Sequence, residues 1–373
     1  MGGTGARWRA TLGLRPAGPR GEWPTTAPDA DALAGDFATA YGMVAGGVWH
    51  APGRVALLGE HTAASGGAAL YAALPWGVTA AVGIAPGGDV RVATPRGPLR
   101  ARERAARAVA EAVDEARGSG LLRADQGVRV LLDSDLPERA SLGRAAAAGA
   151  AVALALADLA GGPPPEGADA DQRVALAARP GHAVRVNLRT LRTRVLPFDL
   201  AEEGLRLLVI DTGALPRRDP RPAHAAAIRS AQEVLGPLRS VGDLRAALRK
   251  LPDRRLRQRV EFEATEPHRL NAAVGLLRAG RAGEVGPVLE ASHLSLRGFG
   301  LPSGGVELAA ETAALSGARG VRMTGWAGTA VALVGEERAE RIERALTRAF
   351  ADRGRIPPRV RPALPSAGAH RLR

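Results

Sequence analysis

Residues 49–71 constrain the fold of this chain more than any other stretch. They read WHAPGRVALLGEHTAASGGAALY, with an apolar run at Val55–Leu58 between turn signals at Pro52–Gly53 and Gly66–Gly67. This order predicts a strand that leads into a loop carrying a guanidinium, a carboxylate and an imidazole. The flanking glycines let the backbone approach a ligand closely. From the residue chemistry alone, a strand followed by a polar hairpin loop without a ligand is the simpler interpretation.

The composition indicates a folded protein without a nucleic-acid partner. The chain has 373 residues, enough for two domains of ordinary size, and 46% of them are apolar. Only 3% are aromatic, so Ala, Leu and Val must build the core. The net charge is +13, but Lys250 is the sole lysine and the arginines are spread along the chain. This spread disfavours a nucleic-acid-binding surface, which would gather basic residues on one face.

Several classes of site are excluded by missing residues. There is no cysteine, so disulfides and thiolate chemistry are absent. The single lysine follows no glycine loop, which excludes a Walker A motif. The longest apolar run, Ala145–Leu159, contains Asp158 and is too short to span a bilayer comfortably. With no apolar signal core at the N-terminus, we expect a cytoplasmic protein with no membrane partner.

Residues 51–67 resemble the signature of galactokinases, in the GHMP superfamily of kinases that also phosphorylate homoserine, mevalonate and phosphomevalonate. In that family the segment reads approximately APGRVNLIGEHTDYNGG. The resemblance implies that Arg54 is catalytic and that Glu60 and His61 contact the sugar. Ala63 stands where the family has an aspartate that binds the sugar, so this contact is missing. A site that loses such an acceptor loses selectivity on the order of 10²-fold or more.

Residues 136–162, LPERASLGRAAAAGAAVALALADLAGG, predict a helix from about residue 143 because they are rich in alanine. They stand in the place of the family's phosphate-binding motif, P-x-G-x-G-L-S-S-S-A-A. There the glycines wrap the phosphate with backbone N–H groups, and a serine helps to hold magnesium. When the motif is aligned on Pro137 and Leu142, an arginine and a serine stand in place of its two glycines. A glycine, an arginine and an alanine stand in place of its three serines. The nucleotide-binding positions implied by this alignment include Arg139, Ser141, Gly143 and Arg144.

Two interpretations of the arginines in this loop stay open. Arg139 and Arg144 could neutralise phosphate with their own charge, or they could be solvent-facing residues at the start of a helix. An arginine in place of a glycine adopts a positive φ only at a cost, and its side chain would crowd a phosphate.

Two later stretches extend the resemblance. Within residues 168–200, Gln172 fixes the register of the family's GMDQ segment and aligns Asp171 with the catalytic aspartate. Residues 322–330, RMTGWAGTA, stand where the family has RMTGGGFGGSA, a glycine turn that supports the nucleotide site. Only Gly325 and Gly328 remain of its glycines, so we assign both to nucleotide binding. No residue is assigned to a metal.

The resemblance runs in order from about residue 36 to residue 368. It implies an α+β, two-domain GHMP kinase fold with the active site in the cleft between the domains. We expect a disordered basic extension over residues 1–28, an N-terminal domain over residues 29–198 and a C-terminal domain over residues 199–373.

The altered motifs leave more than one function open. The family phosphorylates galactose to galactose 1-phosphate with Mg-ATP, and we expect this activity to be weak or lost here. One alternative is an active sugar 1-kinase with a different substrate and an unusual ATP loop. The other is a pseudokinase that needs no cofactor and binds a small-molecule sugar or a partner protein.

Overall fold

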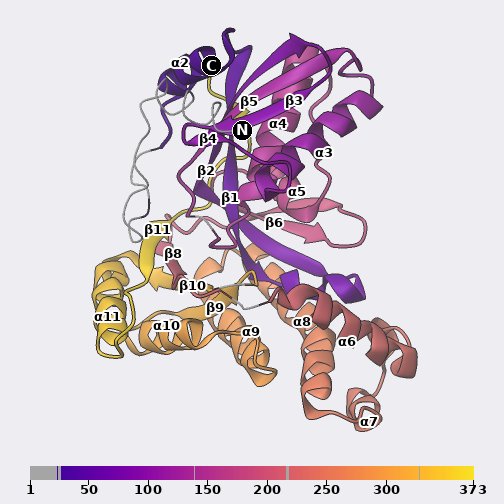
Figure 1. The fold of residues 1–373 in the computed structure, drawn as a ribbon. Coiled ribbons are helices and arrows are strands. Elements are labelled where there is room, and N and C mark those ends of the chain that lie inside the picture. The colour runs from indigo at the N-terminus through magenta and orange to yellow at the C-terminus, as the bar shows by residue number, and fades with distance from the viewer. Residues whose placement is uncertain (1–22, 24–26, 138, 216–217, 327) are drawn as a thin grey trace.

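The computed structural model describes residues 23, 27–137, 139–215, 218–326 and 328–373. They form two β-sheets with helices packed around them (Figure 1). Most of the extension predicted to be disordered, residues 1–28, lies outside the described residues. Within it, Trp23 is buried, with its ring centroid 4.7 Å from that of Trp76.

The strands and helices are mixed along the chain, with a run of helices from α6 to α10. The strands are β1 (Gly47–Leu58), β2 (Ala68–Pro86), β3 (Val90–Thr94), β4 (Gly97–Pro98), β5 (Gln126–Ser134), β6 (His182–Asn187), β7 (Thr193–Pro197), β8 (Leu205–Asp211), β9 (Gly320–Thr324), β10 (Thr329–Gly335), β11 (Arg359–Ala363) and β12 (His370–Arg371). The helices are α2 (Ala30–Tyr41), α3 (Arg104–Gly118), α4 (Arg144–Ala160), α5 (Ala170–Ala177), α6 (Pro220–Leu235), α7 (Leu244–Arg249), α8 (Arg254–Arg278), α9 (Gly286–Gly298), α10 (Gly304–Leu315) and α11 (Ala339–Ala351), with short 3₁₀ turns that include η1 (Glu60–Ser65) and η3 (Ala282–Val285).

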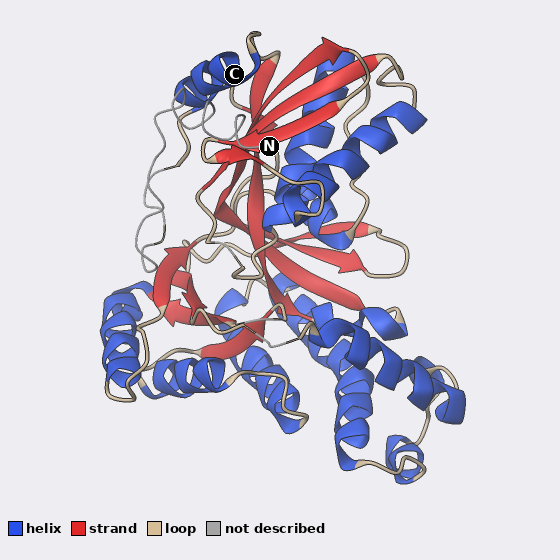
Figure 2. Cartoon of the chain, in the orientation of Figure 1, coloured by secondary structure: helices blue, strands red, loops and turns tan. Residues whose placement is uncertain are grey.

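The first sheet has the strand order β12-β1-β2-β5-β3-β4, and β2 also pairs with β6, which pairs with β7. Alternate residues of β2 bury opposite faces, as the period of a strand requires. Val82 packs with the alanines of α4, whereas Ala81 packs with Phe37 of α2. Helices α3, α4 and α5 lie together on one side of this sheet (Figure 2).

The second sheet has the order β11-β8-β10-β9 and is antiparallel throughout. One face packs on α10 and α11, where Ile210 of β8 meets the buried Leu346. The other face carries Val209 and Val331, which share a core with Val55 and Leu57 of β1. This common core joins the two sheets and fixes how the loops after β1 meet the second sheet.

The predicted domain boundary between residues 198 and 199 falls between strands β1 to β7, which belong to the first sheet, and strands β8 to β11, which form the second. Strand β12 returns to the first sheet, where Trp49 pairs with Arg371 and His50 with His370. The last residues of the chain therefore pack with its first strand. None of the helices in the described residues combines the length and hydrophobicity needed to cross a membrane.

One local prediction was wrong. Pro52–Gly53 forms no turn, because β1 runs through both residues, with a shift in its register against β2 between Pro52 and Arg54. Elsewhere, Gly286–Pro287 begins α9, because proline has no N–H to lose in the first turn of a helix. The predicted helix start near Gly143 is confirmed, since α4 begins at the next residue.

Candidate active site

Arg54 and Asp171 form a two-pronged ion pair. Arg54 comes from β1 and Asp171 from the first turn of α5, which Asp169 caps by accepting from the N–H of Gln172 at 2.8 Å. Arg54 donates from Nε to Asp171 Oδ1 at 2.8 Å and from the terminal nitrogen Nη2 to Oδ2 at 2.5 Å. The aspartate side chain remains 27% exposed against 12% for the arginine. The carboxylate is therefore the side of the pair open to a ligand.

Electrostatics keep Arg54 charged. Burial alone would lower the pKa of Arg54, but the attraction of Asp171 and their hydrogen bonds raise it above its usual value. The Tyr71 ring lies under the guanidinium, with 5.5 Å from the arginine Cζ to the ring centroid. Both donors of this guanidinium edge are therefore used in binding the Asp171 carboxylate.

The loop before α4 holds the backbone shape of a glycine loop without the glycines. Arg139 and Ser141 have φ values of +67° and +58°, in the left-handed region that glycine favours. The neighbours Ala140 and Leu142 are buried in the shared core, so the residues between them must turn sharply. Side chains other than glycine cost about 1–2 kcal/mol each in this conformation. The fold therefore imposes a positive φ on Arg139 in spite of this cost.

Hydrogen bonds connect this loop to both sheets. Arg54 donates from its backbone N–H to the carbonyl of Leu142 at 2.9 Å and from Nη1 to the carbonyl of Ser141 at 2.7 Å. Thr329 of β10 donates its hydroxyl to the carbonyl of Ala140 at 2.6 Å. Gly143 has a φ of +80°, and a Cβ there would lie 3.2 Å from Arg54 Cγ. The loop therefore positions Arg54 directly.

Of the two arginines at the helix start, the Arg139 side chain is exposed and Arg144 is half-buried. The side chains at the three positions aligned with the family's serines carry no hydroxyl: they are Gly143, Arg144 and Ala145.

Glu60 and His61 lie inside the molecule. They belong to η1 and are buried, with 8% and 1% of their surface exposed. His61 Nε2 donates to the carbonyl of Gly325 at 2.8 Å, and Nδ1 faces Arg322 Nη2 at 3.4 Å. Glu60 Oε1 accepts from Arg322 Nη1 at 2.7 Å, while its Oε2 has no hydrogen-bond partner among the described residues. Glu60 thus has one oxygen held in place and one without a partner.

Arg322 is the centre of a buried ionic network that sequence reasoning missed. It is fully buried and reaches Glu60, Glu266 of α8 and the hydroxyl of Ser292 on α9. Ser292 in turn donates to Glu266, and the N–H of Gly59 also donates to this carboxylate, at 3.1 Å. The network connects η1 with α8, α9 and β9. Arg322 lies in residues 322–330, which resemble the family's motif, and this resemblance was the available signal.

The turn after β9 packs against the loop before α4. A Cβ on Gly325, whose φ is +65°, would lie 2.7 Å from Ser141 Cβ, and one on Gly328 would lie 2.3 Å from the carbonyl oxygen of Ala214. Both glycines are therefore needed for close packing. Between them, Trp326 is half-buried, with ring centroids 4.5 Å from His61 and 5.4 Å from His224 of α6.

His224 of α6 lies between α8 and η1. Its Nε2 lies 3.0 Å from Glu263 Oε1 and 3.1 Å from the backbone carbonyl oxygen of His61, and its ring is stacked near Phe299. Ser65, at the end of η1, donates its hydroxyl to the other oxygen of Glu263 at 2.5 Å. An imidazole and a carboxylate thus hold the end of η1 against α8.

Three histidines make the fold sensitive to acid: His61 and His293 are buried and His50 is half-buried. Burial lowers the pKa values of His50, His61 and His293 to about 4. The unfolded chain, with histidine pKa values of about 6.5, binds more protons between these limits, so stability should fall as pH falls from about 6.5 to about 4. We expect a loss of roughly 1–3 kcal/mol per histidine.

Urea unfolding at a series of pH values tests this. His293→Gln should flatten the dependence over this range, whereas the exposed His268 changed to glutamine should leave it as in the unaltered chain. A dependence that His293→Gln leaves unchanged would show that this imidazole does not drive the acid response.

Comparison with known proteins agrees with this arrangement. The structure superimposes on that of a galactokinase from Lactococcus lactis, whose crystal structure is titled as a complex with galactose, with a TM-score of 0.81 and 21% identity. The match covers 92% of this chain and 99% of the other. A mevalonate kinase structure gives a TM-score of 0.60 at 12% identity over 85% of this chain and 98% of the other. The fold is therefore that of the GHMP kinases, as expected.

Sequence comparison shows to which family of the GHMP kinases the chain is similar. Residues 35–84 match the galactokinase galactose-binding signature, and residues 103–187 match the N-terminal domain of GHMP kinases. A galactokinase from Streptomyces coelicolor is 35% identical over 381 residues, covering 90% of this chain and 97% of the relative. The chain belongs to the galactokinase family.

Proposed function

We propose that this chain is a galactokinase-family protein that binds a sugar beside Asp171 and transfers phosphate to it weakly or not at all. The observation that carries the proposal is the loop before α4. It keeps the turned backbone of a phosphate loop, but Arg139 and Ser141 replace its glycines and the start of α4 has no hydroxyl.

On the sugar side, the retained groups suit a hydroxyl ligand. Asp171 is partly exposed, so one of its oxygens can accept a hydrogen bond from a sugar hydroxyl. Glu60 Oε2 is a second acceptor without a partner among the described residues. Arg54 balances the charge of Asp171 and would stabilise negative charge that develops on a phosphoryl group.

On the nucleotide side, the residues fit the phosphates better than the metal. The N-terminus of α4, which carries the positive end of the helix dipole, suits an anion. Magnesium prefers oxygen ligands, and Gly143, Arg144 and Ala145 supply no side-chain oxygen at the helix start. We therefore propose that Mg-ATP, which the family uses, is bound poorly.

An active sugar 1-kinase with a different substrate is the second candidate. Its support is that the loop keeps its turned conformation at residues 139 and 141 and still holds Arg54 against Asp171. A role in binding a partner protein, with or without a sugar, is the third candidate, and its only support is the altered nucleotide loop and the missing sugar aspartate.

A transfer assay with a matched inactive variant separates these functions. Labelled phosphate transfer from ATP to galactose would be measured for the unaltered chain and for Asp171→Asn, with galactose binding followed by calorimetry. We expect galactose to bind saturably. We also expect the transfer rates of the unaltered chain and of Asp171→Asn to lie within about tenfold of each other. A rate for the unaltered chain that exceeds the variant by about 10³-fold or more would establish an active kinase.

A further inference from the structure

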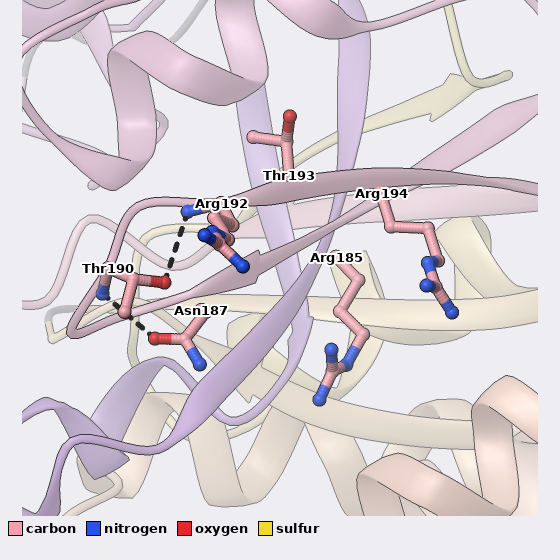
Figure 3. Close-up of a pocket in the computed structure, with 6 residues that line it drawn as sticks. All are labelled: Arg185, Asn187, Thr190, Arg192, Thr193 and Arg194. Carbon is pink, nitrogen blue, oxygen red and sulfur yellow. Dashed lines mark hydrogen bonds between the residues drawn. The ribbon is translucent and has the colours of Figure 1, made fainter.

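The hairpin of β6 and β7 carries a basic pocket that the proposed function does not use. The pocket has a volume of about 380 Å³. Its lining residues are Arg185, Asn187, Thr190, Arg192, Thr193 and Arg194 (Figure 3). Arg185 is half-buried, whereas Arg192 and Arg194 are exposed.

The strand register places like charges against each other. Arg185 and Arg194 are direct partners on the antiparallel ladder of β6 and β7. Their side chains extend to the same side of the hairpin, while Thr193 points to the other side (Figure 3). Like charges directly opposite each other destabilise a sheet. Among the described residues, no carboxylate forms an ion pair with Arg185, Arg192 or Arg194, so the repulsion is not offset within this part of the chain.

The other polar groups of the pocket are also available as donors. Asn187 Oδ1 already accepts from the backbone N–H groups of Arg189 and Thr190, at 3.0 and 2.9 Å. This leaves the amide N–H₂ of Asn187 for a ligand. A pocket with three guanidiniums and an amide donor, and with no acidic side chain in its lining, selects for anions.

We propose that this pocket binds a small organic phosphate or diphosphate with two to three negative charges. Three arginines match such a charge, and guanidiniums bind phosphate oxygens in pairs. The volume is in the range of small-molecule sites, which favours a phosphorylated metabolite over a single inorganic ion.

The hairpin is positioned to pass an effect of the ligand to η1. The N–H of Leu188 donates to the carbonyl of Gly67 at 2.9 Å, and Arg189 reaches the carbonyl of Ser65 at 3.5 Å. The turn between the two strands therefore packs against the segment that carries Glu60 and His61.

Calorimetric titration with pyrophosphate, in about 0.15 M salt to screen weak surface charge, tests the proposal. We expect a saturating isotherm with one site and a dissociation constant of about 1 mM or below. The triple variant Arg185→Gln, Arg192→Gln and Arg194→Gln should weaken binding about tenfold or more. A matched variant on α11 removes the same charge from exposed positions, Arg341→Gln, Arg344→Gln and Arg348→Gln, and should change the affinity less than about twofold.

Three results would overturn the proposal. If the hairpin variant and the α11 variant lose affinity for pyrophosphate equally, binding depends only on the overall charge of the protein. Unchanged affinity in the hairpin variant would place the pyrophosphate elsewhere, such as at the start of α4. An isotherm that does not saturate would show that there is no site. Thermal melting of both variants without ligand verifies that they fold, and pyrophosphate should raise the melting temperature of the α11 variant but not of the hairpin variant.

Discussion

Replacing Arg322 by methionine should lower the free energy of unfolding by about 3–5 kcal/mol. The side chain is fully buried and is the partner of two carboxylates, Glu60 and Glu266. Methionine fills similar space but leaves these charges inside the protein without their main counterion. Urea unfolding at pH 7 measures the effect. The matched control is Arg344→Met, which breaks an exposed i, i+4 pair with Glu340 and should cost less than about 0.5 kcal/mol.

The pH dependence of this effect distinguishes a lost ion pair from lost packing. Burial alone would raise the pKa of Glu60, but the attraction of Arg322 outweighs it and lowers the value to about 2. Without Arg322 the pKa should rise, so acid would protonate the stranded carboxylate and relieve part of the cost. The difference between the unaltered chain and Arg322→Met should therefore shrink from pH 7 to pH 5. A difference that stays constant with pH would show that lost packing, not the lost ion pair, causes the destabilisation. A difference below about 1 kcal/mol would show that the network contributes little to stability.

Restoring the loop residues and the sugar aspartate should raise galactose phosphorylation by about 10²-fold. The changes are Ala63→Asp, Arg139→Gly, Ser141→Gly, Arg144→Ser and Ala145→Ser. The glycines relieve the left-handed strain, the serines supply hydroxyls at the start of α4, and Ala63 is exposed, which leaves room for a carboxylate. The measurement is labelled phosphate transfer from ATP to galactose, with thermal melting to verify folding.

Gly143 should be kept in this variant, although its position aligns with a serine of the family. Its φ is +80°, and a Cβ would crowd the Arg54 side chain at 3.2 Å. We expect the version that adds Gly143→Ser to be less stable and less active. Adding Asp171→Asn to the restored variant should abolish the gain. A folded variant that gains nothing would show that the turn at Trp326, which lacks two residues of the family's motif, limits the site instead.

The sequence predicted which segments meet but not how deeply they are buried. The order of Arg54, Glu60, His61 and Asp171 in matched motifs was sufficient to expect them near one another, and the structure joins Arg54 to Asp171 directly. The sequence did not reveal that Glu60 and His61 are buried. Their burial depends on Arg322, which is more than 250 residues away in the chain, and such pairing depends on tertiary packing rather than local pattern.

The loop before α4 shows a second limit. Local propensity argues against a positive φ at Arg139, but the anchoring of Ala140 and Leu142 in the shared core overrides it. The same holds at Pro52–Gly53, which is a turn signal in isolation but lies inside β1 because β2 pairs with both sides of it. In both places the deciding contacts are distant in sequence, which is why a reading of single segments fails there.

A calorimetric titration with Mg-ATP tests the central claim most directly. Each good hydrogen bond to a phosphate contributes about 1.5–3 kcal/mol, so the loss of two contacts weakens binding by roughly 100-fold or more. The claim of weak or lost transfer predicts no saturating isotherm with millimolar Mg-ATP, while galactose still binds. A clear saturating isotherm with a dissociation constant well below about 1 mM would contradict it.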